Sequence, residues 1–223
     1  YREGQAEMAA LVRQALEEGR PALLEAGTGC GKSFAYLVPL IACGARAFVS
    51  TANKTLQTQL WEKDIPALRQ AVGRPFSAAL LKGRANYVCR FKLGEARQQT
   101  ALPGLEDDLA RLHGWLEETP SGDVEDLRLP ARLRQAVTAG PHDCLSRECP
   151  HFATCCYEQA KIVAEKADLV VVNHALLAFN LATPFLSPRP VVVVDEAHEL
   201  ERYVVNALRL ELEYDAIPGL IND

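Results

Sequence analysis

The sequence predicts an α/β domain built around a parallel sheet, and two motifs support this fold class. The first is Glu25-Ala-Gly-Thr-Gly-Cys-Gly-Lys-Ser33, a P-loop pattern between an apolar run at 22–24 and a helical pattern after Lys32. The second is the run of four valines at 191–194, which ends in Asp195 and Glu196. Runs of β-branched residues are typical of strands buried in a parallel sheet.

The P-loop pattern predicts a site for ATP. Its glycines let backbone N–H groups point at phosphate oxygens, and the positive end of the following helix adds to the attraction. Lys32 is expected to reach the β- and γ-phosphates, and Ser33 to ligate Mg²⁺. A Gly-rich turn that only ends a strand is the alternative interpretation. The residues expected to hold the nucleotide here are Ala26, Gly27, Thr28, Gly29, Cys30, Gly31, Lys32 and Ser33.

The acidic motif supplies the groups that the P-loop lacks. Asp195, at the tip of its predicted strand, is expected to hold the Mg²⁺ brought by Ser33, and Glu196 to polarise the attacking water. The alternative is an acidic cap between a strand and a helix. With both motifs present we predict an ATP site in which Lys32, Asp195 and Glu196 are catalytic.

Length, composition and charge restrict the core size, membrane association and nucleic-acid binding that are expected of this chain. With 223 residues and 48% hydrophobic content, the chain can bury one good core and a second small unit. No apolar run approaches the roughly 20 residues of a membrane span, so no membrane is expected. A net charge of -5 argues against binding nucleic acid over the whole surface, so any such binding must be local. The chain begins at Tyr1 rather than Met, and we therefore expect a piece of a longer protein.

The remaining elements follow in order along the chain. An amphipathic helix is predicted over 5–18, with Gly19 as its stop, and a second helix after Lys32 that bends or ends at Pro39. A third is expected to follow the strand at 46–51 and to end near Pro66. The predicted strands are 22–24, 46–51, 78–81, 168–173 and 191–194.

The alternation of predicted strands and helices stops between residues 82 and 161, which indicates an insertion. This interval holds five of the seven cysteines. Because the cysteine count is odd and an ATP site implies a reducing cytoplasm, disulfides are disfavoured and a metal or cluster is expected. Basic residues also concentrate at its start, namely Lys82, Arg84, Arg90, Lys92 and Arg97.

Four of these cysteines are candidate ligands. Cys144, Cys149 and Cys155 lie close together, and Cys89 stands 55 residues before the first of them. Zinc sites usually contain ligand pairs two to four residues apart, whereas the gaps here are four and five residues, which favours a [4Fe-4S] cluster over zinc. Cys156 is a rival to Cys155. The cysteines outside this interval, Cys30 and Cys43, are expected to be packing residues.

Hydroxyl and amide groups gather after the strand at 46–51, between Ser50 and Gln59. They suit a phosphodiester backbone, although helix capping and ordinary solvation are their commoner uses. The residues predicted to bind DNA here and in the basic cluster are Thr51, Asn53, Lys54, Lys82, Arg84 and Arg90.

Five motifs in this order resemble the bacterial DinG and YoaA helicases, which are XPD-like enzymes of superfamily 2. They are Glu25–Ser33, Val49–Ala52, Leu81–Cys89, Val172–Ala175 and the DEAH-type Val194–His198, with the cysteine triplet between the third and fourth. The resemblance implies a RecA-like motor domain with a mainly helical iron–sulfur insertion, in which Cys89, Cys144, Cys149 and Cys155 ligate the cluster. It also implies that Gln5 reads adenine. Cys30 departs from the threonine expected in the P-loop.

The resemblance further implies an ATP-dependent helicase that moves 5′ to 3′ on single-stranded DNA, forked or gapped structures included, and acts in DNA repair. We expect a monomer in the bacterial cytoplasm. The expected parts are motor domain 1 at 1–81 and 162–200, the cluster domain at 82–161 and the start of an arch domain at 201–223. Because the second motor domain is missing, this chain alone is expected not to unwind DNA.

Two other functions stay open at this point. One is a nucleic-acid-binding module with a structural four-cysteine zinc site and an inactive nucleotide pocket. The other is a P-loop ATPase that acts on protein, for which the basic cluster would be a solvated face. The metal content of the protein distinguishes the zinc module from a helicase. Salt-dependent binding of single-stranded DNA would count against the ATPase that acts on protein.

Overall fold

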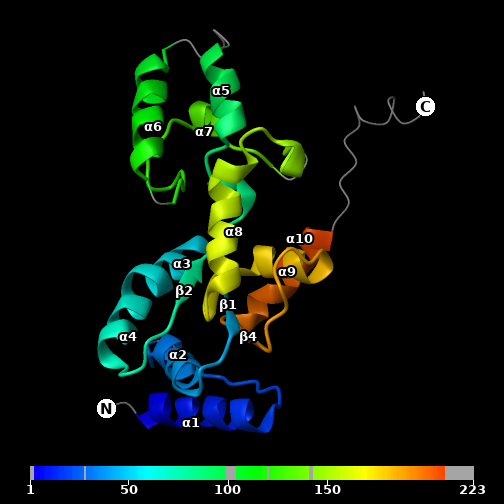
Figure 1. Cartoon of the computed structure of the whole chain (residues 1–223). Helices are drawn as coiled ribbons and strands as arrows, with labels where there is room; N and C mark the ends of the chain where they lie inside the picture. The colour runs from blue at the N-terminus through cyan, green and yellow to red at the C-terminus, as the bar shows by residue number, and fades with distance from the viewer. Residues whose placement is uncertain (1–2, 28, 99–103, 120, 141–142, 209–223) are drawn as a thin grey trace, which may run out of the picture.

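The computed structural model describes residues 3–27, 29–98, 104–119, 121–140 and 143–208. Its centre is a sheet of four parallel strands in the order β2-β3-β1-β4, of which β1, β2 and β4 are labelled in Figure 1. The strands are β1 (Ala47–Thr51), β2 (Ala78–Leu80), β3 (Leu169–Asn173) and β4 (Val191–Val194). The predicted α/β class with a parallel sheet is therefore confirmed.

Helices surround this sheet and form most of the insertion. Before and around the sheet lie α1 (Glu3–Glu18), α2 (Lys32–Cys43), α3 (Lys54–Gln59), the π-helix η1 (Leu60–Asp64), α4 (Ile65–Ala71), α9 (His174–Ala182) and α10 (Leu200–Leu208). The insertion and its exit contain α5 (Arg90–Gln98), α6 (Glu106–Glu118), α7 (Ala131–Val137) and α8 (Cys156–Lys166). Short 3₁₀ turns are η2 (Arg84–Asn86), η3 (Ser146–Glu148), η4 (Phe152–Thr154) and η5 (Ala197–Glu199).

The strands bury side chains on both faces, as alternation along a strand requires. On β1, Ala47 and Val49 pack in one cluster with α2, η1 and α4, outside which α1 lies. Phe48 faces the other way and packs in a second cluster with α8 and α9. Two helical layers therefore cover the sheet, and its carboxyl edge is left for the motif residues.

Two strand expectations are wrong. Residues 22–24 form no strand, and Leu23 is 92% exposed, because no strand of the sheet lies beside it to pair with. The second concerns β4, which forms the edge of the sheet rather than its buried centre. Its Val192 is consequently 45% exposed.

Two helix ends also differ from expectation. Helix α2 does not end at Pro39, one of the two outcomes expected there, but continues to Cys43 and is capped by Gly44, whose left-handed backbone (φ 64°) suits glycine. The helical stretch after β1 passes Pro66 and ends at Ala71. Pro66 is tolerated because it lies in the first turn of α4, directly after the π-helix, where a missing N–H group costs little.

The insertion has a hydrophobic core of its own and is mainly helical, as predicted. Val88 at its entry and Val124 in a loop pack with apolar residues of α5, α6 and α7. Helix α8 runs without a break from the insertion to the sheet, across the boundary expected at residue 161 (Figure 1). The two parts are therefore joined by one rigid element rather than by a linker.

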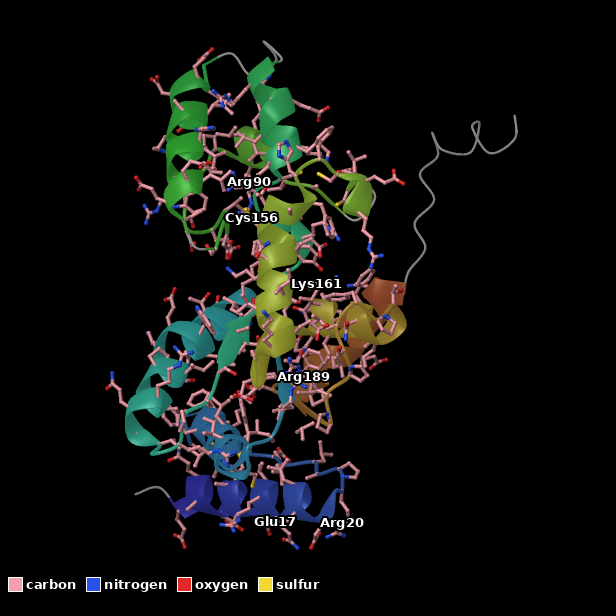
Figure 2. All side chains as sticks on the ribbon, viewed as in Figure 1. Glu17, Arg20, Arg90, Cys156, Lys161 and Arg189 are labelled. Carbon is pink, nitrogen blue, oxygen red and sulfur yellow. The ribbon has the colours of Figure 1, made fainter. Side chains whose placement is uncertain are left out.

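Arg189 holds the carboxyl end of α8 against the sheet (labelled in Figure 2). Its guanidinium donates to the backbone oxygens of Ala164, Ala167 and Asp168 at 2.6, 2.7 and 3.2 Å, and it lies over the ring of Phe48. Only 9% of Arg189 is exposed. A cation at a helix carboxyl end satisfies carbonyl groups that the helix leaves without partners.

A second connection joins the insertion to the sheet through charge. Lys82, 6% exposed, places its ammonium 2.5 Å from Asp123 and 2.8 Å from Glu125. Lys54 at the start of α3 contacts the other oxygen of Glu125 at 2.5 Å. Burial acts to raise the pKa of Glu125, but the hydrogen bonds from both lysines outweigh it and lower the pKa to about 2.

Replacement of Arg189 by alanine is expected to lower the free energy of unfolding by about 2–4 kcal/mol, since it leaves buried carbonyl groups without donors. Urea denaturation measures this change. The control is Arg13→Ala, which removes only an exposed pair with Glu17 and should leave the free energy of unfolding nearly unchanged. Equal effects of the two changes would mean that the contacts of Arg189 do not hold α8.

Replacement of Glu125 by glutamine should lower the free energy of unfolding by about 1 kcal/mol at pH 7, a value discounted for the partial exposure of Glu125. Because the pKa of Glu125 is lower in the folded than in the unfolded chain, its stabilisation is complete above about pH 4.5 and disappears as the pH falls toward 2. Urea denaturation at several pH values should show wild type and variant converge below pH 4.5. The exposed Glu117→Gln is the control, and a constant difference at all pH values would contradict the network.

Candidate functional site

The P-loop lies between α1 and α2 and has the backbone that its glycines allow. Gly29 and Gly31 have φ angles of 77° and 88°, and Gly31 is the N-cap of α2 with no side-chain cap. The backbone N–H groups of the first turn of α2 therefore have no side-chain acceptor at their cap and suit a phosphate. Ala26, Gly27 and Cys30 lie in this loop as coil, and Thr28 lies outside the described residues.

Gln5 reaches the P-loop from α1. Its amide nitrogen donates to the backbone oxygen of Gly31 at 3.0 Å, and a Cβ atom on Gly31 would collide with this amide. Gln5 and the P-loop, 26 residues apart in the sequence, are therefore neighbours. This contact also gives a second physical reason for glycine at position 31, besides its left-handed backbone.

The two motifs that predict the ATP site meet in space. The Nζ atom of Lys32 lies 2.7 Å from Oε1 of Glu196, although 164 residues separate them. Their hydrogen bond is the largest cause that raises the pKa of Lys32 and lowers that of Glu196. Both groups are therefore charged. The carboxylate that is predicted to polarise water is paired with Lys32.

Asp195 lies deeper than Glu196. It accepts a hydrogen bond of 3.3 Å from the hydroxyl of Tyr36 on α2, and burial raises its pKa. Burial raises the pKa of Tyr36 well above its ordinary value, and Asp195 adds to this effect. Tyr36 also interacts with Ser33, so that it connects the two residues predicted to ligate Mg²⁺.

Sequence reasoning missed Tyr36 and one buried acid, Asp64. Asp64 ends the π-helix η1, is 7% exposed, and interacts with Ser33, while burial raises its pKa. One of its oxygens has no hydrogen-bond partner in the described part of the chain. π-Helical turns often occur at functional sites, but the sequence gives no signal that would predict this one.

Glu196 adopts an unusual backbone. Its φ and ψ angles are 54° and 49°, the left-handed region, which costs a non-glycine residue about 1–3 kcal/mol. His198, the last residue of the DEAH-type motif, is 71% exposed at the side chain and lies 3.7 Å from Glu196. The turn at Glu196 is therefore strained and partly open to solvent.

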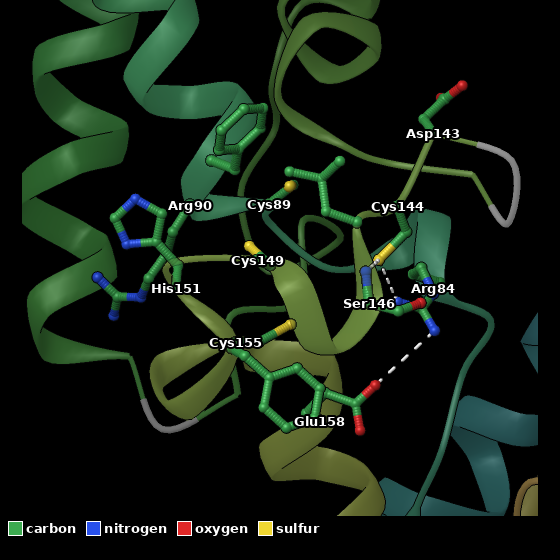
Figure 3. Close-up of a pocket in the computed structure, with 13 residues that line it drawn as sticks. Arg84, Cys89, Arg90, Asp143, Cys144, Ser146, Cys149, His151, Cys155 and Glu158 are labelled. Atoms are coloured by element: carbon green, nitrogen blue, oxygen red, sulfur yellow. Dashed lines mark hydrogen bonds and ion pairs between the residues drawn. The ribbon is translucent and has the colours of Figure 1, made fainter.

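The four predicted cluster ligands line one pocket in the insertion. Cys89, Cys144, Cys149 and Cys155 all contribute to its wall (Figure 3). Within the described ranges, no three His, Cys, Asp or Glu side chains are close enough to hold a single metal ion, so the thiols surround the pocket without meeting at one point. Burial raises the pKa of Cys89, and Cys149 and Cys155 raise it further.

The other cysteines lie elsewhere. Cys156 does not line this pocket. It packs with apolar residues of both the sheet and the insertion, and its sulfur lies where a Cβ atom on Gly122 would be. The pocket therefore favours Cys155 over Cys156. Cys30 is half-buried, whereas Cys43 is exposed at the end of α2 and does not behave as the packing residue that was expected.

Arg84 extends from the basic cluster into the pocket. Its guanidinium donates to the sulfur of Cys144 at 2.5 Å and is 3.7 Å from Glu158 (Figure 3). It also lies 4.4 Å from the centre of the ring of Tyr157. Arg90, at the start of α5, donates to the backbone oxygen of Thr154 and pairs with Glu117. The side chains of Arg84 and Arg90 therefore both bind residues of the insertion.

The remaining residues predicted to bind DNA also have internal partners. Asn53 accepts from the backbone N–H of Leu56 and so caps α3, while Thr51 is fully buried and donates to the backbone oxygen of Asn53. Lys54 and Lys82 share Glu125. In the basic cluster, Lys82, Arg84, Arg90 and Lys92 are therefore paired with acids of the insertion, which the sequence did not reveal because those acids lie 27 or more residues further along the chain.

Comparison with known proteins agrees with the motifs. The DEAD_2 family model matches residues 132–217. The ATP-dependent DNA helicase YoaA of Escherichia coli K12 is 36% identical over 89% of this chain and 33% of its own length. The ATP-dependent helicase DinG of Mycobacterium tuberculosis is 40% identical over 95% of this chain and 36% of its own. The 3′-5′ exonuclease DinG of Bacillus subtilis is 33% identical over 90% of this chain and 23% of its own.

The chain thus spans about a third or less of the length of these curated relatives. No helix among the described residues is long and apolar enough to cross a membrane. Of the region expected to begin an arch, residues 209–223 lie outside the described residues. The similarity to the DinG and YoaA proteins extends over nearly the whole of this chain, as its motifs predict.

Proposed function

We propose that this chain is the nucleotide-binding part of an ATP-dependent DNA helicase that moves 5′ to 3′ on single-stranded DNA. The observation that carries the proposal is the contact of 2.7 Å between Lys32 of the P-loop and Glu196 of the acidic motif. It brings together a cation for the phosphates and a carboxylate for the water, as phosphoryl transfer requires. The printed names of the YoaA and DinG relatives support the helicase assignment.

The ion pair between Lys32 and Glu196 must break when ATP binds. When the γ-phosphate arrives, it competes with Glu196 for the ammonium of Lys32, and the released carboxylate is free to orient a water molecule. Ser33 and Asp195 are the groups that would hold Mg²⁺, with Tyr36 between them. Because Glu196 has a strained backbone, its release also allows the turn to relax.

A [4Fe-4S] cluster fits the cysteine pocket. Four thiols from three separate segments surround one space, and Arg84 supplies a cation beside Cys144, which suits thiolates. Cys89, Cys144, Cys149 and Cys155 would hold the cluster. Bound there, it would supply a cross-link between the start of α5, the loop after α7 and the start of α8.

DNA is proposed as the partner, with single strands and forked or gapped structures as substrates, and a cytoplasmic monomer as the working form. Asn53 and Lys54, which follow β1 and are exposed, are the proposed contact, whereas Thr51 is buried. Since Lys54 is paired with Glu125, a phosphate that binds there must compete with that carboxylate. Binding of labelled oligo(dT) at several salt concentrations tests this contact, and the absence of salt-dependent binding would favour an ATPase that acts on protein.

Lys32→Ala in the full-length protein should abolish nucleotide binding and ATP hydrolysis together. Glu196→Gln should keep nucleotide binding but lower the turnover by about 10²–10⁴-fold, because the amide cannot activate water. Binding of a fluorescent ATP analogue and release of phosphate in the presence of oligo(dT) measure the two steps. Glu199→Gln, three residues further along the same turn, is the control and should leave both unchanged. Normal turnover by Glu196→Gln would remove Glu196 from the catalytic role.

Anaerobically purified protein should contain about four iron atoms and four labile sulfides per chain. Serine at any of Cys89, Cys144, Cys149 or Cys155 should lower both, whereas Cys156→Ser and Cys43→Ser are the matched controls and should keep them. Iron and sulfide assays with visible absorbance provide the measurement. Stoichiometric zinc without iron would instead support a structural zinc module.

A further inference from the structure

Arg90 connects two of the cysteines that are proposed as cluster ligands. It follows Cys89 directly and begins α5, and its side chain, 27% exposed, extends toward other segments of the insertion (labelled in Figure 2). Its Nε atom donates a hydrogen bond of 3.1 Å to the backbone oxygen of Thr154. Thr154 directly precedes Cys155. One side chain therefore joins the residue after one cysteine to the residue before another.

The same guanidinium also holds a third segment. Its Nη1 atom lies 3.2 Å from a carboxylate oxygen of Glu117, near the end of α6, and Nη2 donates to the backbone oxygen of Leu116 at 3.5 Å. A guanidinium is planar and carries five N–H donors in fixed directions, so it can bind two segments with a defined geometry. Arg90 therefore joins the start of α5, the end of α6 and the turn before α8.

Cys89, on one side of this connection, is held by the main chain itself. Its N–H group donates to the backbone oxygen of Val137 at 2.7 Å. Its own backbone oxygen accepts from the N–H group of Leu93, in the first turn of α5, at 2.9 Å. The position of Cys89 therefore depends on backbone hydrogen bonds and not on the side chain of Arg90.

Cys155, on the other side, follows the 3₁₀ turn η4, which is only three residues long. Because the hydrogen bonds of such a turn have poor geometry, contacts from outside are needed to fix its position. Gln159 of α8 donates to the backbone oxygen of Ala153 at 2.8 Å, and Arg90 donates to that of Thr154. Gln159 holds the turn against α8, whereas Arg90 holds it against the segment of Cys89.

A second basic residue of α5 makes a similar but weaker contact. The Nζ atom of Lys92 lies 2.9 Å from a carboxylate oxygen of Asp143, which precedes Cys144. The side chain of Asp143 is 54% exposed, so solvent screens this pair. Arg90 instead binds a backbone oxygen, and this oxygen belongs to the peptide unit that leads into Cys155. Of the two residues, Arg90 therefore has the more direct effect on a cysteine.

We propose that Arg90 is a positioning residue for the cluster, whose hydrogen bond from Nε to Thr154 sets the spacing between Cys89 and Cys155. Arg90 and both cysteines line the same pocket (Figure 3). Arg90 itself supplies no ligand atom. Residues that orient metal ligands from outside typically change the metal affinity by about 10- to 100-fold. The inference rests on the proposed function, because the cluster is part of that proposal.

Two substitutions of the same length isolate this hydrogen bond. In Arg90→Gln the amide nitrogen takes the place of Nε along the side chain and can donate to Thr154, whereas Arg90→Met has a methyl group there. Both variants lose the pair with Glu117. In the full-length protein, purified without oxygen, a chelator should remove iron about 10-fold faster from Arg90→Met than from wild type. Arg90→Gln should stay within about threefold of the wild-type rate, measured by visible absorbance.

The control is Arg97→Met, at an exposed position of the same helix, which should lose iron at the wild-type rate. Equal rates of iron loss from Arg90→Gln and Arg90→Met would overturn the proposal, because the two variants differ only in the donor to Thr154.

A second measurement needs no cluster. In chelator-treated protein, the peptide over 151–156 should exchange its amide hydrogens faster in Arg90→Met than in Arg90→Gln, because the amides of Thr154 and Cys155 donate within the turn that Arg90 holds. Equal exchange in the two variants would also overturn the proposal. Wild-type protein that contains neither iron nor sulfide would defeat the proposed cluster alone, since hydrogen exchange still reports whether Arg90 positions Cys155.

Discussion

The hydrogen bond between the amide of Asp195 and the backbone oxygen of Ser50 is the constraint on which the candidate site depends. It extends the parallel register of β1 and β4 by one residue beyond the last strand pair. As a result, Asp195 lies against α2, where Tyr36 reaches it, and Glu196 follows at the position that Lys32 can contact. The two motifs, far apart in the sequence, meet because the carboxyl ends of parallel strands share one edge of the sheet.

Much of the fold could be predicted because its signals are local. The buried runs at 47–51 and 169–173 read as strands, and the apolar spacing over 5–18 reads as the helix that the structure shows as α1. The wrong expectations depend on which segments lie beside a residue, not on the helix or strand propensity of the residue itself. Leu23 has the composition of a strand residue but no strand beside it, and Pro66 is tolerated because of its place in α4.

The same distinction applies to the candidate site. Spacing was sufficient to predict the P-loop and the acids, since each is a short motif. It left Cys155 and Cys156 as rivals, and only the pocket, which Cys155 lines and Cys156 does not, favours one of them. Spacing was not sufficient to predict that Lys82 is buried between Asp123 and Glu125, or that Asp64 lies beside Ser33. These contacts arise where the insertion and a π-helix fold back onto the sheet, and no local pattern records such an approach.

The open edge of β4 has a consequence for handling this chain. Among the described residues, β4 pairs with β1 on one side only, and Val192 is 45% exposed. A run of four valines with free backbone groups is a template on which another copy of the strand can pair. Self-association of this chain would then grow with concentration and begin at β4, so that a soluble preparation depends on covering that edge or on placing a lysine at position 192.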